Sequence, residues 1–364
     1  MEIESESLHP LSHLSIAELY DHIISGLNEI ENRFRVTNSK EIKHAIQTAL
    51  FTLNSKIFTI LNVVAFKGRS ADDYTPFRAN VEHSKLQQPN TYICSFDYSE
   101  NILVPHLIET PGIFFFKTRR KIDLFGITNE STDRQLNFLI DEPFKISKGP
   151  NSVISMLDYY IKRNIPEGVK LIFYADNCAA QNKNSTMIAY LCYLAKIIKR
   201  HPQIELYFMI SGHTKFTPDR HFGTIKSKIR TENCFSIQNL IGEQGLIKKS
   251  AYNNDVIAYK DPITRMVEFD WFDWKNYFNK KFIPCKGIQK WHAVKIHPGG
   301  EEILVANYID QNYESVKVMK KDESLLESVS KIIPEGFDDA RKNELKFFKD
   351  YVTSDHHAFV CGSY

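Results

Sequence analysis

The chain has 364 residues, of which 43% are hydrophobic and 25% are charged, and its formal net charge is +2 at pH 7. This length can bury a sizeable core, and the nearly neutral balance gives no overall affinity for polyanions, so any nucleic-acid contact must be local. The six cysteines include no Cys-x-x-Cys pair, which argues against a zinc ribbon or a disulfide scaffold and favours a reducing compartment. The acidic N-terminus has no apolar h-region, and no apolar run approaches the ~20 residues of a membrane helix, so neither secretion by that route nor membrane association is expected.

The first 89 residues are predicted to form a helical region and a linker. Apolar residues recur at steps of three and four over residues 14–30 and again over 42–64, which predicts two amphipathic helices. Such helices usually serve packing or dimer contacts, so no chemistry is assigned to them. Residues 67–89 are polar and contain Gly68, Pro76 and Pro89, which indicates a linker that ends near residue 89.

Strand signals follow the linker. Residues 91–98 and 112–118 are rich in aromatic and β-branched side chains, and residues 121–128 together with 135–140 supply a third strand. Because short turns connect them, we expect an antiparallel meander of three strands.

Helices and strands then alternate. The spacing of apolar residues predicts a helix over 152–163, a strand over 169–175, a helix over 185–200, a strand over 204–210 and a helix over 217–230. In the last helix, Thr217 is predicted as the N-cap, Pro218 as the first helical residue and Asp219 as an acid of the first turn. The order β-β-β-α-β-α-β-α is the succession of the ribonuclease H-like fold, a mixed five-stranded α/β sheet flanked by helices. We therefore predict one such domain over residues 90–232.

A C-terminal extension over residues 233–364 is predicted to contain a small antiparallel unit and a helix. Strand signals cover residues 291–297, 302–309 and 315–319, and residues 325–351 read as helical. The segment 269–282 interleaves aromatic residues with lysines, which could stack bases or pack a helix face on a core. We favour core packing for it.

Four sequence motifs carry a resemblance to a known family. The stretch from about Tyr92 to Arg230 resembles the integrase/transposase-type, ribonuclease H-like nuclease domain of a large set of mobile-element-derived eukaryotic proteins. The motifs are Ser95-Phe96-Asp97-Tyr98, Phe115-Phe116-Lys117-Thr118, Asp176-Asn177-Cys178 with Gln181-Asn182-Lys183-Asn184, and the run from Gly212 to Phe216 with Pro218-Asp219-Arg220-His221-Phe222-Gly223. The resemblance implies a metal-dependent nuclease or transferase.

Three aspartates are the candidate catalytic residues and metal ligands. In this fold the first strand lies beside the fourth, so Asp97 and Asp176 would meet across adjacent strands, and the helix after the fifth strand would bring Asp219 to the same place. Carboxylates held this close repel one another and are tolerated mainly when divalent cations neutralise them. Oxygen ligands suit Mg²⁺ or Mn²⁺. Two such ions could activate a water or 3′-hydroxyl and stabilise the leaving oxygen of a phosphodiester.

Each aspartate also has a structural interpretation. Asp97 could be an outward-facing strand residue, Asp176 could form a turn with Asn177, and Asp219 could complement its helix dipole, worth about 0.3–1 kcal/mol. Asn184 would then cap the following helix.

The third acid departs from the commonest transposase pattern, which ends in glutamate. Glu205 lies at the start of a strand and Glu232 beyond the helix, so both fit the third position less well than Asp219 does.

Polar and basic residues around these acids are candidates for contacts with phosphate or for orienting the substrate. The candidate substrate-binding residues are Asn177, Gln181, Lys183, His213, Lys215, Arg220, Lys226 and Arg230. For residues 226–230, a solvated basic helix face is the alternative. For His213, a hydrogen-bonding role is favoured over metal ligation.

Together these observations predict a transposon-derived, divalent-metal-dependent polynucleotidyl transferase or nuclease that acts on DNA. A catalytically silent nucleic-acid- or protein-binding module with the same fold is the alternative from another class, and an RNA-directed nuclease is a third hypothesis. DNA is the expected partner, self-association into a homo-oligomer is a further expectation, and an intracellular, nuclear location fits action on DNA.

Overall fold

The computed structural model describes residues 90–209, 216–307, 312–320 and 328–362. The chain divides into two compact units, Met1–Thr75 and Pro76–Tyr364, and every described element belongs to the second unit. The helices and linker expected over residues 1–89 lie outside the described residues.

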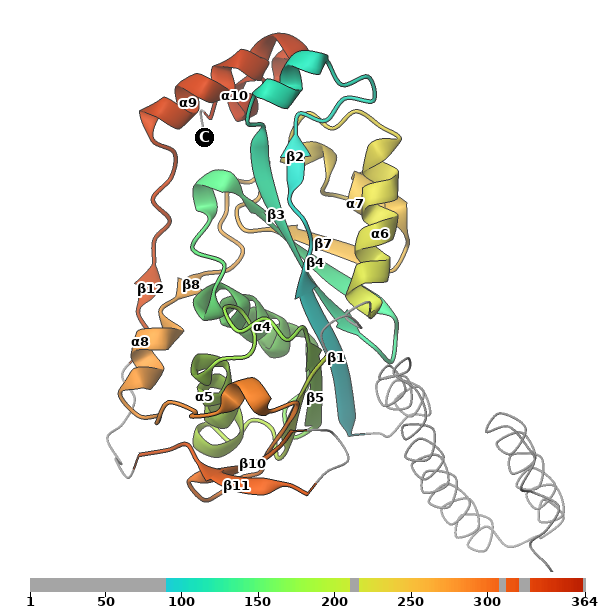
Figure 1. Cartoon of the computed structure of the whole chain (residues 1–364). Helices are drawn as coiled ribbons and strands as arrows, with labels where there is room; N and C mark the ends of the chain where they lie inside the picture. The colour runs from blue at the N-terminus through green and yellow to red at the C-terminus, as the bar shows by residue number, and fades with distance from the viewer. Residues whose placement is uncertain (1–89, 210–215, 308–311, 321–327, 363–364) are drawn as a thin grey trace, which may run out of the picture. The chain divides into compact units, whose positions relative to one another are not determined.

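A mixed sheet of ten strands forms the centre of the second unit (Figure 1). Nine strands lie side by side in this order: β11 (Glu314–Lys317), β10 (Glu302–Ala306), β9 (Ala293–Ile296), β6 (Ile204–Phe208), β5 (Lys170–Ala175), β1 (Thr91–Tyr98), β3 (Arg120–Asn129), β4 (Arg134–Asp141) and β7 (Asn254–Ala258). The tenth, β2 (Ile102–Val104), pairs with β3. The pairs β1–β5, β5–β6 and β4–β7 are parallel, and the other pairs are antiparallel. The fold is therefore mixed α/β, and its main sheet has ten strands where a five-stranded sheet was expected for the domain.

The expected strand at residues 112–118 is wrong. Its first five residues form a 3-10 helix, η1 (Gly112–Phe116), in which Phe114 is buried while Phe115 and Phe116 are exposed. This burial does not follow the alternation of a strand. The two runs that were expected to supply one strand instead form two, β3 and β4, so the antiparallel meander consists of β1, β3 and β4.

Helices cover both faces of the sheet (Figure 1). On one face, α4 (Pro150–Asn164), α5 (Ser185–Cys192) with the π-helical turn η3 (Tyr193–Ile197), and α8 (Trp274–Asn279) enclose a core that includes Phe96, Phe125 and Phe173. On the other face, α6 (Thr217–Arg230) and α7 (Leu246–Ser250) enclose a second core with Leu124 and Leu139. The second core also receives the C-terminal elements α9 (Asp339–Leu345), η6 (Lys346–Tyr351) and α10 (His357–Val360).

Short elements complete the described part of the chain. They are the 3-10 helices η2 (Glu142–Phe144), η4 (Ile237–Asn239), η5 (Ile288–Lys290) and η7 (Ser354–His356), and a separate two-stranded sheet of β8 (Trp271–Phe272) and β12 (Lys331–Ile332). The helix expected over 325–351 is thus partly wrong, because helical structure begins only at Asp339.

The C-terminal part of the chain contributes to the same sheet and core. Strands β9, β10 and β11, expected as a separate unit, extend the main sheet, because β9 supplies hydrogen-bond partners to the backbone of β6. In the aromatic-basic segment, Phe269, Trp271, Trp274, Phe278 and Phe282 are all buried. The prediction that this segment packs into the core is confirmed.

Among the described residues, no helix is long and apolar enough to cross a membrane. All six cysteines carry free thiols, and four of them are buried.

Candidate functional site

Asp97 and Asp176 lie at equivalent positions on two adjacent parallel strands. The register of β1 and β5 ends with the pair Phe96 and Ala175, and the two aspartates follow directly. Phe96 and Ala175 belong to the core under α4 and α5. Because successive side chains alternate between faces, both carboxylates project to the opposite face, on which α6 packs against β1 and β3.

Helix α6 carries the third aspartate in its first turn. The helix begins at Thr217 with Phe216 as its N-cap, and Oδ2 of Asp219 accepts a hydrogen bond from the backbone N–H of Phe216 at 3.2 Å. This capping contact also places a negative charge at the positive end of the helix dipole. The structural role considered for Asp219, an acid that complements the helix dipole, is therefore present. The predicted start of the helix is one residue late: Thr217, expected as the N-cap, is the first helical residue, and Pro218 is the second. The hydroxyl of Thr217 donates a hydrogen bond to Glu130.

The three aspartates interact electrostatically. The pKa of Asp97 is raised from 3.8 to about 7, chiefly by burial, and the charges of Asp176 and Asp219 raise it as well. The backbone N–H of Tyr98, which donates to Oδ1 of Asp97 at 2.7 Å, opposes this shift. Residues from two strands and one helix, far apart in the sequence, are thus brought within electrostatic range of one another.

The three carboxylates do not form a compact ligand set. In the described part of the chain, no group of three or more His, Cys, Asp and Glu side chains is placed to hold a metal ion. Each aspartate instead accepts a hydrogen bond from a nearby backbone N–H; for Asp176 the donor is Asn177, at 2.6 Å. The turn expected at Asp176 and Asn177 is not formed there, because this contact reaches only the next residue and the turn lies at residues 179–182.

A fourth carboxylate, which the sequence pattern does not indicate, joins the elements that carry the first and third aspartates. Glu130, between β3 and β4, is 2% exposed. One of its oxygens accepts a hydrogen bond from the hydroxyl of Ser95 on β1, and the other accepts one from Thr217 on α6 at 2.7 Å. Burial raises the pKa of Glu130 to about 7, while the two hydroxyls lower it. Glu130 therefore ties β1 to α6 close to the aspartates, through contacts that only the folded chain reveals.

A glycine lets α6 approach the sheet beside the first aspartate. Gly126 on β3 is the register partner of Asp97. A Cβ atom at Gly126 would lie 2.7 Å from the side chain of Gln135 and 2.9 Å from the ring of Phe222 on α6. Both separations are too short for a real contact, so this approach of the helix requires glycine.

The loop after β5 contains buried polar atoms without partners. The side-chain oxygens of Asn177 and Asn182 and the amino group of Lys183 are buried and make no hydrogen bond. Lys183 is 0% exposed, its amino group lies 5.1 Å from the ring centre of Phe208, and burial lowers its pKa to about 8. The predicted contact of Lys183 with phosphate requires an amino group at the surface. The amino group of Lys183 does not reach the surface. Gln181 in the same loop is half-buried.

The end of this loop has a structural role. Asn184 accepts a hydrogen bond from the backbone N–H of Met187 at 3.0 Å, so it caps α5 as expected.

Most basic residues of α6 are engaged by protein carboxylates. The ion pairs are Arg220 with Asp133, Lys226 with Glu100, and Lys228 with Glu232. The solvated-face interpretation therefore fits Lys226 and Lys228. Arg230 is exposed and has no carboxylate partner among the described residues.

The remaining predicted candidates fall into two groups. His213 and Lys215 lie outside the described residues. The two glutamates considered for the third acid are engaged elsewhere: Glu205 pairs with Lys170 at 2.8 Å, and Glu232 pairs with Lys228.

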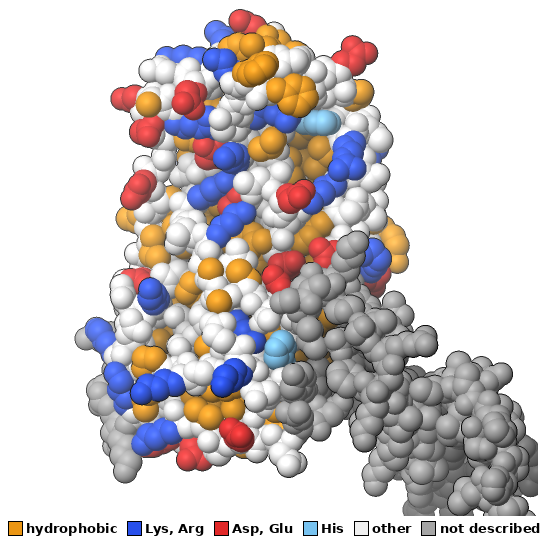
Figure 2. Space-filling model, in the orientation of Figure 1, with side chains coloured by type: hydrophobic (Ala, Val, Ile, Leu, Met, Phe, Trp, Pro, Cys, Tyr) orange, Lys and Arg blue, Asp and Glu red, His pale blue; other side chains and the backbone are white. Residues whose placement is uncertain are grey.

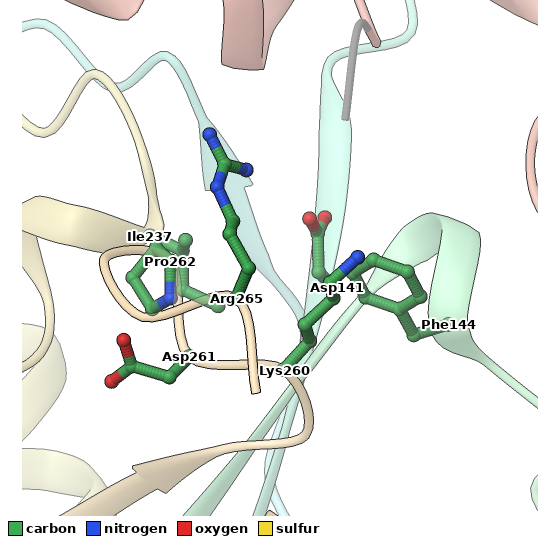
Figure 3. A pocket seen from close by; sticks show the side chains of 7 residues that line it. All are labelled: Asp141, Phe144, Ile237, Lys260, Asp261, Pro262 and Arg265. Carbon is green, nitrogen blue, oxygen red and sulfur yellow. The ribbon is translucent and has the colours of Figure 1, made fainter. Parts of the chain in front are cut away.

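A small pocket at the end of β4 is not a competing site (Figure 3). Asp141 forms a buried ion pair with Arg120, and Asp261 accepts hydrogen bonds from the backbone N–H groups of Ile263 and Thr264. In Figure 3, the side chain of Asp261 points away from Asp141 and Lys260. The two acids of this pocket are thus already engaged.

A family model described as "Domain of unknown function (DUF7869)" matches residues 117–339. The chain belongs to the DUF7869 family. The DUF7869 match includes Asp176, Asp219 and Glu130 but begins after β1, so it leaves Asp97 out. Comparisons with curated proteins and with solved structures find no significant match.

Proposed function

We propose that the chain is a transposon-derived, divalent-metal-dependent polynucleotidyl transferase or nuclease that acts on DNA phosphodiesters and has a ribonuclease H-like fold. Support for this fold comes from the middle of the sheet, where the order is β6, β5, β1, β3 and β4. Three antiparallel strands come first in the chain, and two parallel strands with intervening helices follow. This order of strands and helices is the order expected for a ribonuclease H-like fold.

The observation that carries the functional proposal is that β1, β5 and the first turn of α6 bring Asp97, Asp176 and Asp219 to one face of the sheet. The charges of Asp176 and Asp219 add to the effect of burial in raising the pKa of Asp97. Burial and like charges together make this carboxylate costly to ionise. Perturbed acids of this kind concentrate at functional sites. A purely structural set of turn and capping residues has no need to gather three negative charges on one face.

The donors at this site suit a hard cation by type. Asp97, Asp176 and Asp219 supply carboxylate oxygens, and Asn177 supplies a buried amide oxygen without a hydrogen-bond partner. Mg²⁺ and Mn²⁺ prefer such oxygens. When bound, two ions of this class supply an activated water or 3′-hydroxyl and stabilise the leaving oxygen. To hold them, the three carboxylates would turn from their backbone hydrogen bonds toward one another.

The other residues of the site would position these acids. Glu130 holds the strand of Asp97 against the helix of Asp219 through Ser95 and Thr217. Gly126 allows the same helix to lie close to β3. The geometry of the acids thus depends on contacts that do not themselves touch a substrate.

A catalytically silent DNA- or protein-binding module is the second candidate function. It is favoured by the absence, in the described residues, of any three-residue group placed to hold a metal ion. The backbone hydrogen bonds of all three aspartates agree with it as well.

A nuclease assay separates the two functions. The full chain is incubated with 5′-labelled single-stranded DNA, duplex DNA and single-stranded RNA, with Mg²⁺, with Mn²⁺ or with EDTA. We expect metal-dependent cleavage or strand transfer of DNA that is lost in Asp97→Asn, Asp176→Asn and Asp219→Asn, while Glu205→Gln, a control remote from the site, stays active. DNA binding without any product under all conditions would favour the silent module, and cleavage of RNA alone would move the substrate class to RNA.

A further inference from the structure

The 3-10 helix η1 presents two phenylalanines to solvent. The side chains of Phe115 and Phe116 are 84% and 83% exposed, and the neighbouring Ile113 is 42% exposed. Large apolar side chains that are this exposed and adjacent commonly mark a binding surface.

The turn is anchored, so the backbone that carries the two rings is held in place. Phe114, the middle aromatic residue, is buried and makes edge-to-face contacts with Phe348 and Tyr351 of η6, at centroid distances of 5.1 and 4.9 Å. Because Phe114 fixes the turn to the C-terminal helices, Phe115 and Phe116 project from a packed base. Rigid aromatic side chains bind with a small loss of conformational entropy.

Two cations without carboxylate partners lie beside this turn, and a third lies at the end of α6. The amino group of Lys117 lies 5.0 Å from the ring centre of Phe347, and the guanidinium of Arg119 lies 5.9 Å from that of Phe114. Burial, together with the charges of Arg119 and Arg230, lowers the pKa of His106, which places both arginines near this histidine. In the described part of the chain, none of Lys117, Arg119 and Arg230 forms an ion pair with a carboxylate. Figure 2 shows hydrophobic and basic side chains side by side at this end of the molecule.

Helix α6 connects this surface to the candidate site. Asp219 lies in its first turn and Arg230 is its last residue. At 1.5 Å per residue, the two are separated by roughly 16 Å along the helix, a span of a few nucleotides. A strand that leaves the three aspartates along α6 would arrive at η1.

We propose that Phe115 and Phe116, with Lys117, Arg119 and Arg230, form a docking surface for single-stranded DNA. The aromatic rings would stack on bases, and the three cations would contact phosphates. This inference rests on the proposed function for the choice of DNA as ligand. We define these five residues as the η1 surface.

The chemistry of the η1 surface selects this ligand over others. A protein partner that buried the apolar rings would need carboxylates to neutralise three cations, whereas nucleic acid carries aromatic faces and anions together. Duplex DNA hides its base faces inside the stack, so exposed phenyl rings gain more from a single strand.

The test measures binding of a fluorescent oligo(dT) strand, and of a duplex of equal length, to the full chain in EDTA, where cleavage does not interfere. We expect Phe115→Ala and Phe116→Ala to weaken single-strand binding about 10-fold each and duplex binding much less. Tyr252→Ala is the matched control, because Tyr252 is 84% exposed on another surface. Lys117→Gln and Arg230→Gln should each reduce the salt slope of single-strand binding by about 0.7.

Two outcomes would overturn the inference. Single-strand affinity that is unchanged in the Phe115→Ala/Phe116→Ala double variant would remove the surface from DNA binding. A wild-type dimer in light scattering that becomes monomeric in this variant, with DNA affinity unchanged, would assign the rings to a second copy of the chain.

The experiments separate an error in the η1 surface from an error in the proposed function. Asp176→Asn should abolish cleavage and keep oligo(dT) binding. If the wild-type chain cleaves DNA but the η1 variants bind normally, only the η1 surface is refuted.

Discussion

Asp97 and Asp176 stand one residue beyond the last register pair of two adjacent parallel strands, on the face that α6 covers. This pairing places two carboxylates from distant segments of the sequence next to each other. It also means that the charge of Asp176 adds to the cost of ionising Asp97.

The first prediction concerns Asp176→Asn, which removes one of these charges and keeps the side chain's shape. With Mg²⁺ at ~100 times its dissociation constant, the wild-type chain should gain ~2.7 kcal/mol, because the ion binds only the folded state. The variant should be as stable as the wild type or more stable without metal, and its magnesium-induced rise in melting temperature should be smaller. Differential scanning fluorimetry measures both effects, with Asp355→Asn, an exposed carboxylate, as control. A variant that melts lower without metal and responds to Mg²⁺ like the wild type would make Asp176 only a structural residue.

The second prediction concerns the pH dependence due to Glu130. The folded chain keeps this proton up to about pH 7, whereas the unfolded chain releases it near 4.5. Since the folded state binds more protons between these values, the contribution of Glu130 makes stability fall as the pH rises from 4.5 to 7. Glu130→Gln should flatten this part of the profile by up to ~3 kcal/mol. Urea unfolding at pH 4.5, 6 and 8 measures it, and an unchanged slope would refute the assignment.

The third prediction compares two glycines. Gly126→Ala should destabilise the fold by about 1–3 kcal/mol, because its methyl group would overlap Gln135 and Phe222. Gly223→Ala, in α6 with nothing within 4 Å of the new methyl group, should stabilise by about 0.5–1 kcal/mol through helix propensity. Chemical denaturation measures both. Equal effects of the two substitutions would mean that α6 does not press on β3 at Gly126.

The fourth prediction concerns the buried amine of Lys183. At pH 7, Lys183→Met should stabilise the chain by about 1–3 kcal/mol, because it removes a buried polar group without a hydrogen-bond partner. The folded wild type releases this proton at about pH 8 and the unfolded chain at 10.5, so the wild-type contribution makes stability rise between these values. The variant should lack that rise.

Denaturation at pH 7, 8.5 and 10 measures this effect, with the exposed Lys286→Met as control. A cleavage defect in Lys183→Met at full stability would instead give this lysine a part in the reaction.

The sequence predicts local elements well where the spacing of apolar residues agrees with the Gly, Pro and capping residues that bound each element. The strand expected at residues 91–98 matches β1, and the helix expected over 217–230 matches α6. The ribonuclease H-like fold expected from the resemblance also places β1 beside β5, and the two strands pair. The error at 112–118 arises because three consecutive phenylalanines resemble a buried strand, although only Phe114 is buried.

Local sequence patterns do not predict the long-range contacts of the site. Glu130 appears in the sequence as one acid in a turn, and its link to Ser95 and Thr217 depends on how β1, β3 and α6 pack. The pairing of β7 with β4 and of β9 with β6 depends on segments more than 80 residues apart. No local pattern states which strand a segment will join.

The outer strands have a consequence for cutting the chain into fragments. Strands β7 and β9 cover the open sides of β4 and β6. A fragment of residues 90–232 would leave both sides as long, unprotected strand edges, and such edges recruit further chains. This fragment should aggregate when expressed alone, and the last third of the chain would then act as the solubilising cover of the part that carries the acids.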